Sequence, residues 1–312
     1  MAVSPGTARA PGTAPARFPD FFVVGHPKCG TTALYDMLSQ HPQIFMSPVK
    51  EPRYFVADDE LRFPALRQRT QEKYLQLFAG AAPGQRTGEA SPQYLASHFA
   101  AGAIATANPS ARIIAILREP ASFIRSLHHH YVRRGIDRAG DLGEAFAAGS
   151  SDPLWQYYEQ RVHYVDQLER YRAAFPPSHV LVLIYDDYRS SNIDTMRRVF
   201  RFLRVDEEHE VAPRDLNMAF GVRSRIAALL WQRMMLGQGR ASAALGRVAR
   251  AAIPHRARDD VRALYRRANL TSPPVTDEAL MARLRVQFAP EVAKASEYLG
   301  RDLRGLWGYP DG

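Results

Sequence analysis

Short runs of apolar residues alternate with longer segments in which apolar residues recur at helical spacing. The three clearest runs are Phe21 to Val24, Ile113 to Leu117 and Val180 to Tyr185. Continuous runs of this length are typical of strands that are buried on both faces of a parallel sheet. Because helical segments separate the runs, the pattern predicts an α/β fold with a central parallel sheet flanked by helices.

Helical spacing and helix start and stop signals define the segments between and after these strands. A glycine loop and then a helix follow the first run, a helix beginning near a proline follows the second, and a long helix precedes the third. The predicted helices are Thr32 to Ser39, Pro120 through Ser126 towards Arg134, Tyr157 to Ala174, one with Ser191 as its N-cap, and an amphipathic closing helix within Thr276 to Leu299.

Two segments depart from the alternating pattern. Residues 1–17 consist of Pro, Ala and Gly with scattered arginine, and we expect a disordered tail. Residues 222–268 are arginine-rich and helical in composition, with eleven arginines and two aspartates between Val222 and Arg267. No linker divides the remainder, so the prediction is a single domain over residues 18–312 that contains this arginine-rich insert.

Composition narrows the class of protein. The chain has 312 residues, of which 46% are hydrophobic, and a formal net charge of +9, which favours an anionic ligand or surface. A single cysteine excludes an intrachain disulfide framework and favours a cytoplasmic location. No apolar run approaches the ~18 residues needed to span a bilayer.

Candidate chemistry begins with GHPKCGTT at residues 25–32, between the first predicted strand and its helix. Backbone N–H groups and the helix dipole converge on one point there, and Gly25 and Gly30 allow close approach of an anion. Nucleoside triphosphatases place a lysine directly after the second glycine. Here Thr31 occupies that position and the lysine is Lys28, so the loop suits a phosphate donor that needs no bound metal.

Four segments, taken in order, carry a resemblance to a known family. PKCGTTAL from Pro27 resembles the 5′-phosphosulfate loop of sulfotransferases that use 3′-phosphoadenosine 5′-phosphosulfate. The family motif R-x-P-x5-S is matched in LREPASFIRS, which begins at Leu117. KEPRYF from Lys50 and GEASPQYL from Gly88 match segments of the carbohydrate-type and bacterial branches. The match runs from about Phe18 to Leu203 and implies a P-loop-like sulfotransferase domain.

The resemblance implies a role for each matched residue of the donor site. Backbone amides of Lys28, Cys29, Gly30, Thr31 and Thr32 would hold the 5′-phosphate, with the threonine hydroxyls assisting. Lys28 would also neutralise charge on the bridging oxygen as the sulfuryl group leaves. The 3′-phosphate would contact Arg118 and Ser126, with a further basic residue, Arg223 or Arg225, from a later loop.

Proton transfer from the acceptor needs a base, and the resemblance implies Glu51. His26 is a rival base, although its position inside the loop favours packing or capping. Glu89 lacks the neighbouring lysine that some relatives carry, so we expect it to bind the acceptor if it has a chemical role. The run His128 to His130 is interpreted as helix surface or as lining of the acceptor cleft, because consecutive helical positions point about 100° apart and share a metal ion poorly.

The predicted activity is therefore that of a sulfotransferase of the EC 2.8.2 type, with 3′-phosphoadenosine 5′-phosphosulfate as donor and no required metal. The acceptor would be a hydroxyl of a small molecule, a glycan or a glycolipid. The apolar stretch from Ile226 to Leu236 adds the expectation of peripheral membrane contact. Two alternatives stay open: a divergent P-loop nucleotide kinase or triphosphatase, and a non-enzymatic binder of anionic surfaces. Nucleic acid is not an expected partner, and the oligomeric state is left open.

Overall fold

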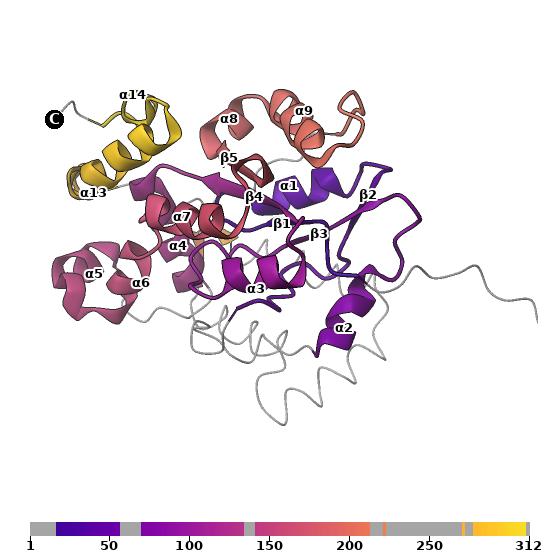
Figure 1. The fold of residues 1–312 in the computed structure, drawn as a ribbon. Coiled ribbons are helices and arrows are strands. Elements are labelled where there is room, and N and C mark those ends of the chain that lie inside the picture. The colour runs from indigo at the N-terminus through magenta and orange to yellow at the C-terminus, as the bar shows by residue number, and fades with distance from the viewer. Residues whose placement is uncertain are drawn as a thin grey trace, which may run out of the picture. The chain divides into compact units, whose positions relative to one another are not determined.

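The computed structural model describes residues 17–56, 70–133, 141–212, 221–222, 270–271 and 277–309 (Figure 1). The chain divides into two compact units. The first combines residues 1–118 with residues 164–216, and the second combines residues 119–163 with residues 217–312.

The first unit is built on a five-stranded parallel sheet in the order β2-β3-β1-β4-β5. This sheet confirms the predicted α/β class with a central parallel sheet. The strands of the sheet are β1 (Phe21–Val23), β2 (Ile44–Met46), β3 (Arg86–Ala90), β4 (Arg112–Leu117) and β5 (Val180–Ile184). The helices of this unit are α1 (Thr31–Leu38), α2 (Gln71–Leu75), α3 (Ala100–Ala107), α7 (Tyr164–Ala174), α8 (Tyr185–Ser190) and α9 (Asn192–Leu203), with 3-10 turns at Gln76–Phe78 and Pro177–His179.

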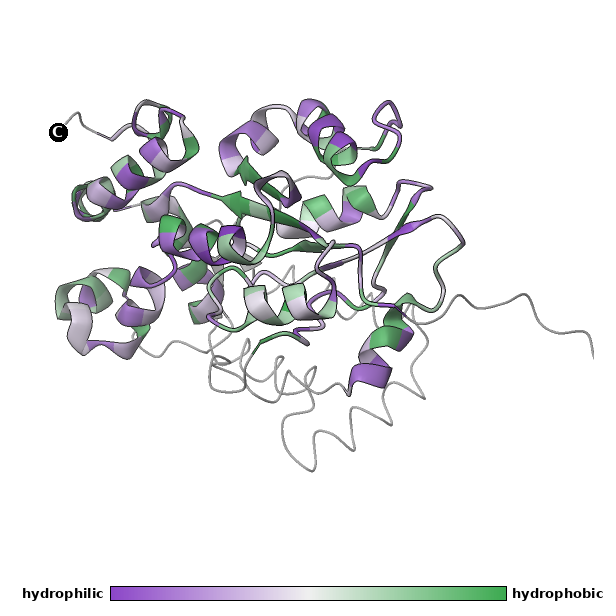
Figure 2. Cartoon of the chain, in the orientation of Figure 1, coloured by the Kyte–Doolittle hydropathy of each residue, from purple (hydrophilic) through white to green (hydrophobic). Residues whose placement is uncertain are grey.

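Helices cover both faces of this sheet. Helices α1, α8 and α9 lie on one side and α3 and α7 on the other (Figure 1). The placement of α1 opposite α3 and α7 follows from right-handed crossovers, because the chain moves from β1 towards β2 in one direction and from β3 through β4 to β5 in the other. Helices α8 and α9 follow the last strand of the sheet. Figure 2 shows the strands mostly in the hydrophobic colour, whereas the helices carry both colours. The sheet is therefore the buried core of the unit.

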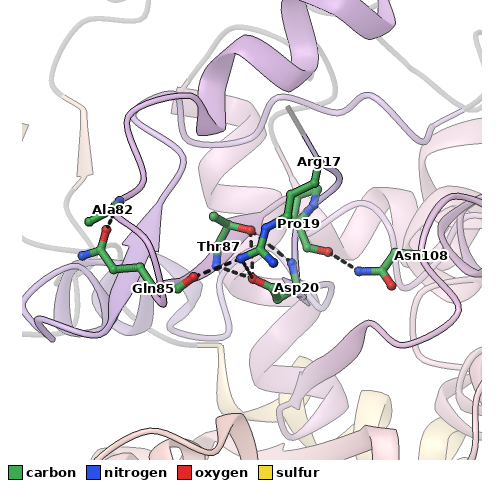
Figure 3. A network of polar contacts seen from close by, with 7 residues as sticks. All are labelled: Arg17, Pro19, Asp20, Ala82, Gln85, Thr87 and Asn108. Carbon is green, nitrogen blue, oxygen red and sulfur yellow. Dashed lines mark hydrogen bonds and ion pairs between the residues drawn. The ribbon is translucent and has the colours of Figure 1, made fainter. Parts of the chain in front are cut away.

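A polar network fixes the first strand at the amino edge of the sheet (Figure 3). The carboxylate of Asp20 accepts hydrogen bonds from the amide (2.7 Å) and the hydroxyl (3.1 Å) of Thr87, at the start of β3. Arg17 donates to the same carboxylate (3.2 Å) and to the carbonyl of Gln85 (3.1 Å). Asn108 donates to the carbonyl of Pro19 (2.9 Å). These bonds set the register of β1 against its neighbours before the apolar residues begin.

The strand order also determines which loops lie next to one another at the carboxyl edge of the sheet. Strand β1 pairs with β3 on one side and with β4 on the other, so Val23 lies opposite both Ala90 and Ile114. The loops that follow β1, β3 and β4 therefore leave the sheet side by side, at the edge where parallel α/β sheets bind ligands.

The described part of the second unit is mainly helical. Its elements are α4 (Pro120–Arg133), α5 (Leu142–Ala148), a 3-10 turn at Gly149–Ser151, α6 (Pro153–Glu159), α13 (Glu278–Leu299), α14 (Leu303–Trp307) and a two-stranded antiparallel ribbon of β6 (Gly221–Val222) and β7 (Leu270–Thr271). Helix α13 packs on α4, and the ring of Phe288 stacks on Trp155 at 6.1 Å between centroids.

Several sequence expectations are confirmed and two are wrong. The three apolar runs form β1, β4 and β5, Ser191 caps α9 by accepting from the amide of Asp194, and α13 occupies the predicted closing segment. The single helix expected over Tyr157 to Ala174 is instead the end of α6 and the whole of α7, separated by a turn at residues 160–163. His128 is not on the helix surface, because it is only 2% exposed.

Candidate active site

The loop between β1 and α1 continues the pairing of β1 with β4 before it turns. The amide of His26 donates to the carbonyl of Ile116 (3.2 Å), and the amide of Cys29 turns back to the carbonyl of His26 (3.2 Å). Lys28 and Gly30 both have left-handed backbone conformations, with φ of 68° and 87°. Only glycine adopts this conformation without strain, so a strained lysine indicates a turn held by its surroundings.

The turn delivers the start of α1 to the carboxyl edge of the sheet. Gly30 precedes the helix and has no side chain to cap it, so the first-turn amides are directed at the open end of the helix. Thr31 is buried, whereas Lys28, Gly30 and Thr32 are partly exposed. Backbone amides, a hydroxyl and an ammonium group gathered at one helix start are the kind of arrangement that binds phosphate groups in proteins.

Two side chains of the loop are structural. His26 is fully buried, and its Nε2 lies 2.7 Å from Oε1 of Gln167 on α7. Cys29 is also fully buried, and burial raises the pKa of its thiol to about 12 despite the nearby charges of Arg118 and Lys28. The loop thus keeps the side chains of His26 and Cys29 packed in the core, while Lys28, Gly30 and Thr32 are partly exposed.

Arg118 follows β4 and reaches this loop. Its guanidinium donates a hydrogen bond to the carbonyl of Lys28 (2.9 Å) and lies over the ring of Tyr185, 4.6 Å from the centroid. The hydroxyl of Tyr164 donates to the backbone carbonyl of Arg118 (2.7 Å). A guanidinium has five N–H donors, so further donors remain for an anion after the bond to Lys28.

Glu51 lies on the loop that follows β2 and runs past the carboxyl end of β3. Its amide donates to the carbonyl of Ala90 (3.0 Å), so the loop is fixed to the strand next to β1. The carboxylate is 29% exposed and pairs with Lys50, at 3.1 Å from Nζ to Oε1, and with the guanidinium of Arg53. Glu51 and Arg53 both have left-handed φ, of 58° and 55°.

The charge state of Glu51 results from two opposing effects. Burial raises the pKa of the carboxyl group, but the charges and hydrogen bonds of Lys50 and Arg53 outweigh it, and the pKa is lower than that of an ordinary glutamate. Glu51 is therefore ionised at neutral pH and is able to accept a proton.

Glu89, expected to bind the acceptor if it had a role, does not reach solvent. It is fully buried, and its carboxylate accepts hydrogen bonds from Tyr74 (2.6 Å), Tyr94 (2.9 Å) and Ser91 (2.7 Å). A carboxylate enclosed in this way contacts the protein's own hydroxyl groups.

The other predicted residues belong to the second unit. Ser126 is a partly exposed residue of α4. Glu119, which was not a predicted site residue, lies just before α4 and accepts from the amides of Ala121 and Ser122 and from the hydroxyl of Tyr309 (2.6 Å). Arg223, Arg225 and nearly all of the arginine-rich insert lie outside the described residues, as does the segment from Ile226 to Leu236.

The histidine run has three different environments rather than one shared site. Nδ1 of His128 lies 3.3 Å from the hydroxyl of Tyr158, in the interior of the unit. His129 and His130 are partly exposed, and burial together with the charges of His128 and Arg125 lowers the pKa of His129 to about 4. Within the described ranges, no three His, Cys, Asp or Glu side chains group in a way that would hold a metal ion.

Sequence reasoning did not identify Tyr164 and Tyr185 as contacts of Arg118. Tyr185 ends the third apolar run, and this position predicts a place at the carboxyl edge of the sheet, near Arg118. Tyr164 begins α7, and no local pattern distinguishes it from other tyrosines.

The fold and the site together define a phosphate-binding α/β protein in which an arginine of the neighbouring strand supports the binding loop. A family model described as the sulfotransferase domain matches residues 18–220, which is more than half of the chain. The chain belongs to this sulfotransferase family. The match includes the loop, Glu51 and Arg118, and it ends before the arginine-rich insert.

Relatives and a solved structure agree with this assignment. The chain is 26% identical to human carbohydrate sulfotransferase 15, with 60% of this chain and 44% of the relative covered. It is 26% identical to human heparan sulfate glucosamine 3-O-sulfotransferase 6, with 64% and 56% covered. The chain thus spans about half the length of these curated relatives. A crystal structure of a sulfotransferase from Alicyclobacillus acidocaldarius is 25% identical, with a TM-score of 0.68 over 93% of this chain and 98% of that one.

Two alternatives find no support in the described residues. Position 31, where a triphosphatase needs its lysine, is a buried threonine at the start of α1. The anionic-surface alternative rests on the arginine-rich insert, which the structure does not describe. Among the described helices, none combines the length and the apolar character needed to cross a bilayer.

Proposed function

We propose that this protein transfers a sulfuryl group from 3′-phosphoadenosine 5′-phosphosulfate to a hydroxyl group of an acceptor. The observation that carries the proposal is the contact between Arg118 and the carbonyl of Lys28, at 2.9 Å. It brings the basic residue after β4 to the phosphate loop after β1, as a donor with phosphates at both ends of one nucleoside requires.

In this proposal, the first-turn amides of α1 and the hydroxyl of Thr32 hold the 5′-phosphate, and Arg118 binds the 3′-phosphate. Glu51 takes the proton of the acceptor hydroxyl as its oxygen bonds to sulfur. The bond between sulfur and the phosphate oxygen breaks, and Lys28 neutralises the charge that develops on that oxygen. The second product is adenosine 3′,5′-bisphosphate, and the reaction needs no redox partner.

We propose a glycan or another hydroxyl-bearing small molecule as the acceptor. The names of the two human relatives refer to carbohydrate and to heparan sulfate glucosamine, and these names support a sugar as the first acceptor class to test. A glycolipid acceptor, a cytoplasmic location and peripheral membrane contact stay predictions from the sequence.

Transfer of sulfur-35 from labelled donor to a panel of sugars tests the activity, and calorimetry with adenosine 3′,5′-bisphosphate tests the site. We expect Lys28→Ala to lower kcat by about 10²–10³-fold, as expected for loss of charge stabilisation at the leaving oxygen. Lys73→Ala is the matched control, because Lys73 is an exposed lysine of α2. Absence of binding heat in the unsubstituted protein would overturn the proposed function.

A further inference from the structure

Glu89 is a fully buried carboxylate that three hydroxyl groups surround. Tyr74 and Tyr94 donate to Oε1 at 2.6 and 2.9 Å, and Ser91 donates to Oε2 at 2.7 Å. Burial, and after it the charge of Glu89, raises the pKa of both tyrosines well above the ordinary value, so both phenols keep their protons. The carboxylate accepts all three of these hydrogen bonds, and it therefore fixes the direction of all three O–H groups.

Two of these hydroxyl groups also accept hydrogen bonds from the loop that carries Glu51. The amide of Arg53 donates to Oγ of Ser91 (3.1 Å), and the amide of Phe55 donates to the hydroxyl of Tyr94 (3.2 Å). Each hydroxyl accepts from the loop because its own proton is directed at Glu89. The carboxylate thus polarises two chains, each running from an amide through a hydroxyl to a carboxylate oxygen.

The third hydroxyl belongs to a ring that packs on the same loop. Tyr74 stacks on Tyr54, with centroids 4.3 Å apart and an interplanar angle of 11°. The amide of Glu51 is held separately by the carbonyl of Ala90. Alternate amides of the loop, at positions 51, 53 and 55, are therefore all bound to the segment from residue 90 to residue 94.

The loop needs such support because its conformation is strained. The described part of the chain has four non-glycine residues with positive φ, and two of them are Glu51 and Arg53. A left-handed non-glycine residue costs on the order of 1–3 kcal/mol and persists only where the surroundings impose it. Without the anchored amides, the loop would relax and its carboxylate would move.

We propose that Glu89 is a positioning residue, which holds the Glu51 loop in the strained conformation that presents the base to the acceptor. The inference rests on the proposed function in assigning Glu51 as the base. Glu89 itself contacts neither donor nor acceptor, since no part of it is exposed.

Glu89→Gln tests the proposal with an almost unchanged shape. The new NH2 group donates where one carboxylate oxygen accepted, so either Ser91 or both Tyr74 and Tyr94 lose their acceptor, and the chain from that side to the loop is weakened. Amide hydrogen exchange, measured by NMR on the protein without substrate, reports this directly. We expect the amides of Arg53 or Phe55 to exchange at least about tenfold faster, while the amide of Val24 in the β1–β4 pairing keeps its rate.

Single hydroxyl deletions separate the two chains and remain informative if Glu89→Gln does not fold. Tyr94→Phe should speed exchange at Phe55 and leave Arg53 unchanged, and Ser91→Ala should do the reverse. Tyr188→Phe is the control for loss of a buried phenol, because Tyr188 donates to the sulfur of Met37 on α1 (3.2 Å), away from this network.

Kinetics supply the second readout. Displacing a reacting group by about 1 Å costs up to about 10² in rate, so Glu89→Gln should lower kcat by roughly 10–100-fold. Its affinity for adenosine 3′,5′-bisphosphate should stay within about twofold of the parent, since Glu89 is not assigned to the donor. A general structural role would weaken donor binding together with kcat.

Unchanged exchange at residues 53 and 55 in Glu89→Gln would overturn the inference, and so would a parallel loss of kcat and donor affinity. Because exchange is measured without substrate, it decides the role of Glu89 even if the unsubstituted protein transfers no sulfuryl group. A lack of sulfuryl transfer by the unsubstituted protein would count against the proposed function instead.

Discussion

Replacement of Arg118 separates the two roles of this side chain, one seen in the structure and one proposed. The guanidinium supports the loop by donating to the carbonyl of Lys28, and in the proposed function it also binds the 3′-phosphate of the donor. Adenosine 3′,5′-bisphosphate and adenosine 5′-phosphate differ only in that 3′-phosphate. The loss of affinity in Arg118→Ala should therefore differ between the two nucleotides.

The expected magnitudes follow from the contacts. Loss of the single hydrogen bond from a charged donor to the Lys28 carbonyl costs about 1.5 kcal/mol, or tenfold in Kd, for either nucleotide. The bisphosphate should lose about 2–3 kcal/mol more, because a forked guanidinium–phosphate contact disappears as well. Its Kd should rise by roughly 10³-fold, against about tenfold for the monophosphate.

Isothermal titration calorimetry of the parent and of Arg118→Ala with both nucleotides gives the four dissociation constants. Arg118→Lys is the matched variant, since it keeps the charge but loses the planar fork, and it should fall between the two. Equal losses for both nucleotides would refute the assignment of Arg118 to the 3′-phosphate and leave it with a role in loop support alone.

Three further outcomes are expected. Lys50→Met removes one of the charges that lower the pKa of Glu51, so the acid limb of the kcat/KM profile should move to higher pH; an unmoved limb would argue against Glu51 as the base. With its pKa at about 12, Cys29 should react with iodoacetamide at pH 8 roughly 10³-fold more slowly in the folded protein than in urea. Mass spectrometry measures the labelling, and equal rates would contradict the burial. Gly88→Ala places a Cβ 2.1 Å from a ring atom on β1 and should destabilise by about 1–3 kcal/mol in urea unfolding. Gly102→Ala, an exposed α3 position with nothing within 4 Å, should not.

The apolar runs predicted the strands that are buried through hydrophobic contact alone. Strand β3 has the sequence RTGEA, and its pattern gave no indication of a central strand. Thr87 and Glu89 of this strand are nevertheless buried, because Thr87 bonds to Asp20 and Glu89 to three hydroxyl groups. Such burial depends on partners that are distant in sequence, and periodicity carries no information about them.

Part of the candidate site could likewise be predicted from the sequence. Motif resemblance indicated Lys28, Glu51 and Arg118, and the parallel topology then places their three segments, which follow β1, β2 and β4, at the same carboxyl edge of the sheet. The ion pairs that keep Glu51 charged and the ring beneath Arg118 were not predictable, because they depend on side-chain directions. The breaking of the expected helix between α6 and α7 was also missed, since helical spacing continues across the turn.

The residues of this site that have a strained backbone are also held by hydrogen bonds with other segments of the chain. Three of the four non-glycine residues with positive φ in the described part are Lys28, Glu51 and Arg53. Each is held by a hydrogen bond to a segment at the end of another strand. Arg118, after β4, donates to the carbonyl of Lys28, while Ala90 and Ser91, at the end of β3 and just after it, accept from the amides at positions 51 and 53. The sheet fixes the donors and acceptors, and these hold backbone conformations that the loops would not adopt alone. A rigid parallel core is thus the physical reason that a donor loop and a base from distant parts of the chain can be kept in strained conformations at one edge.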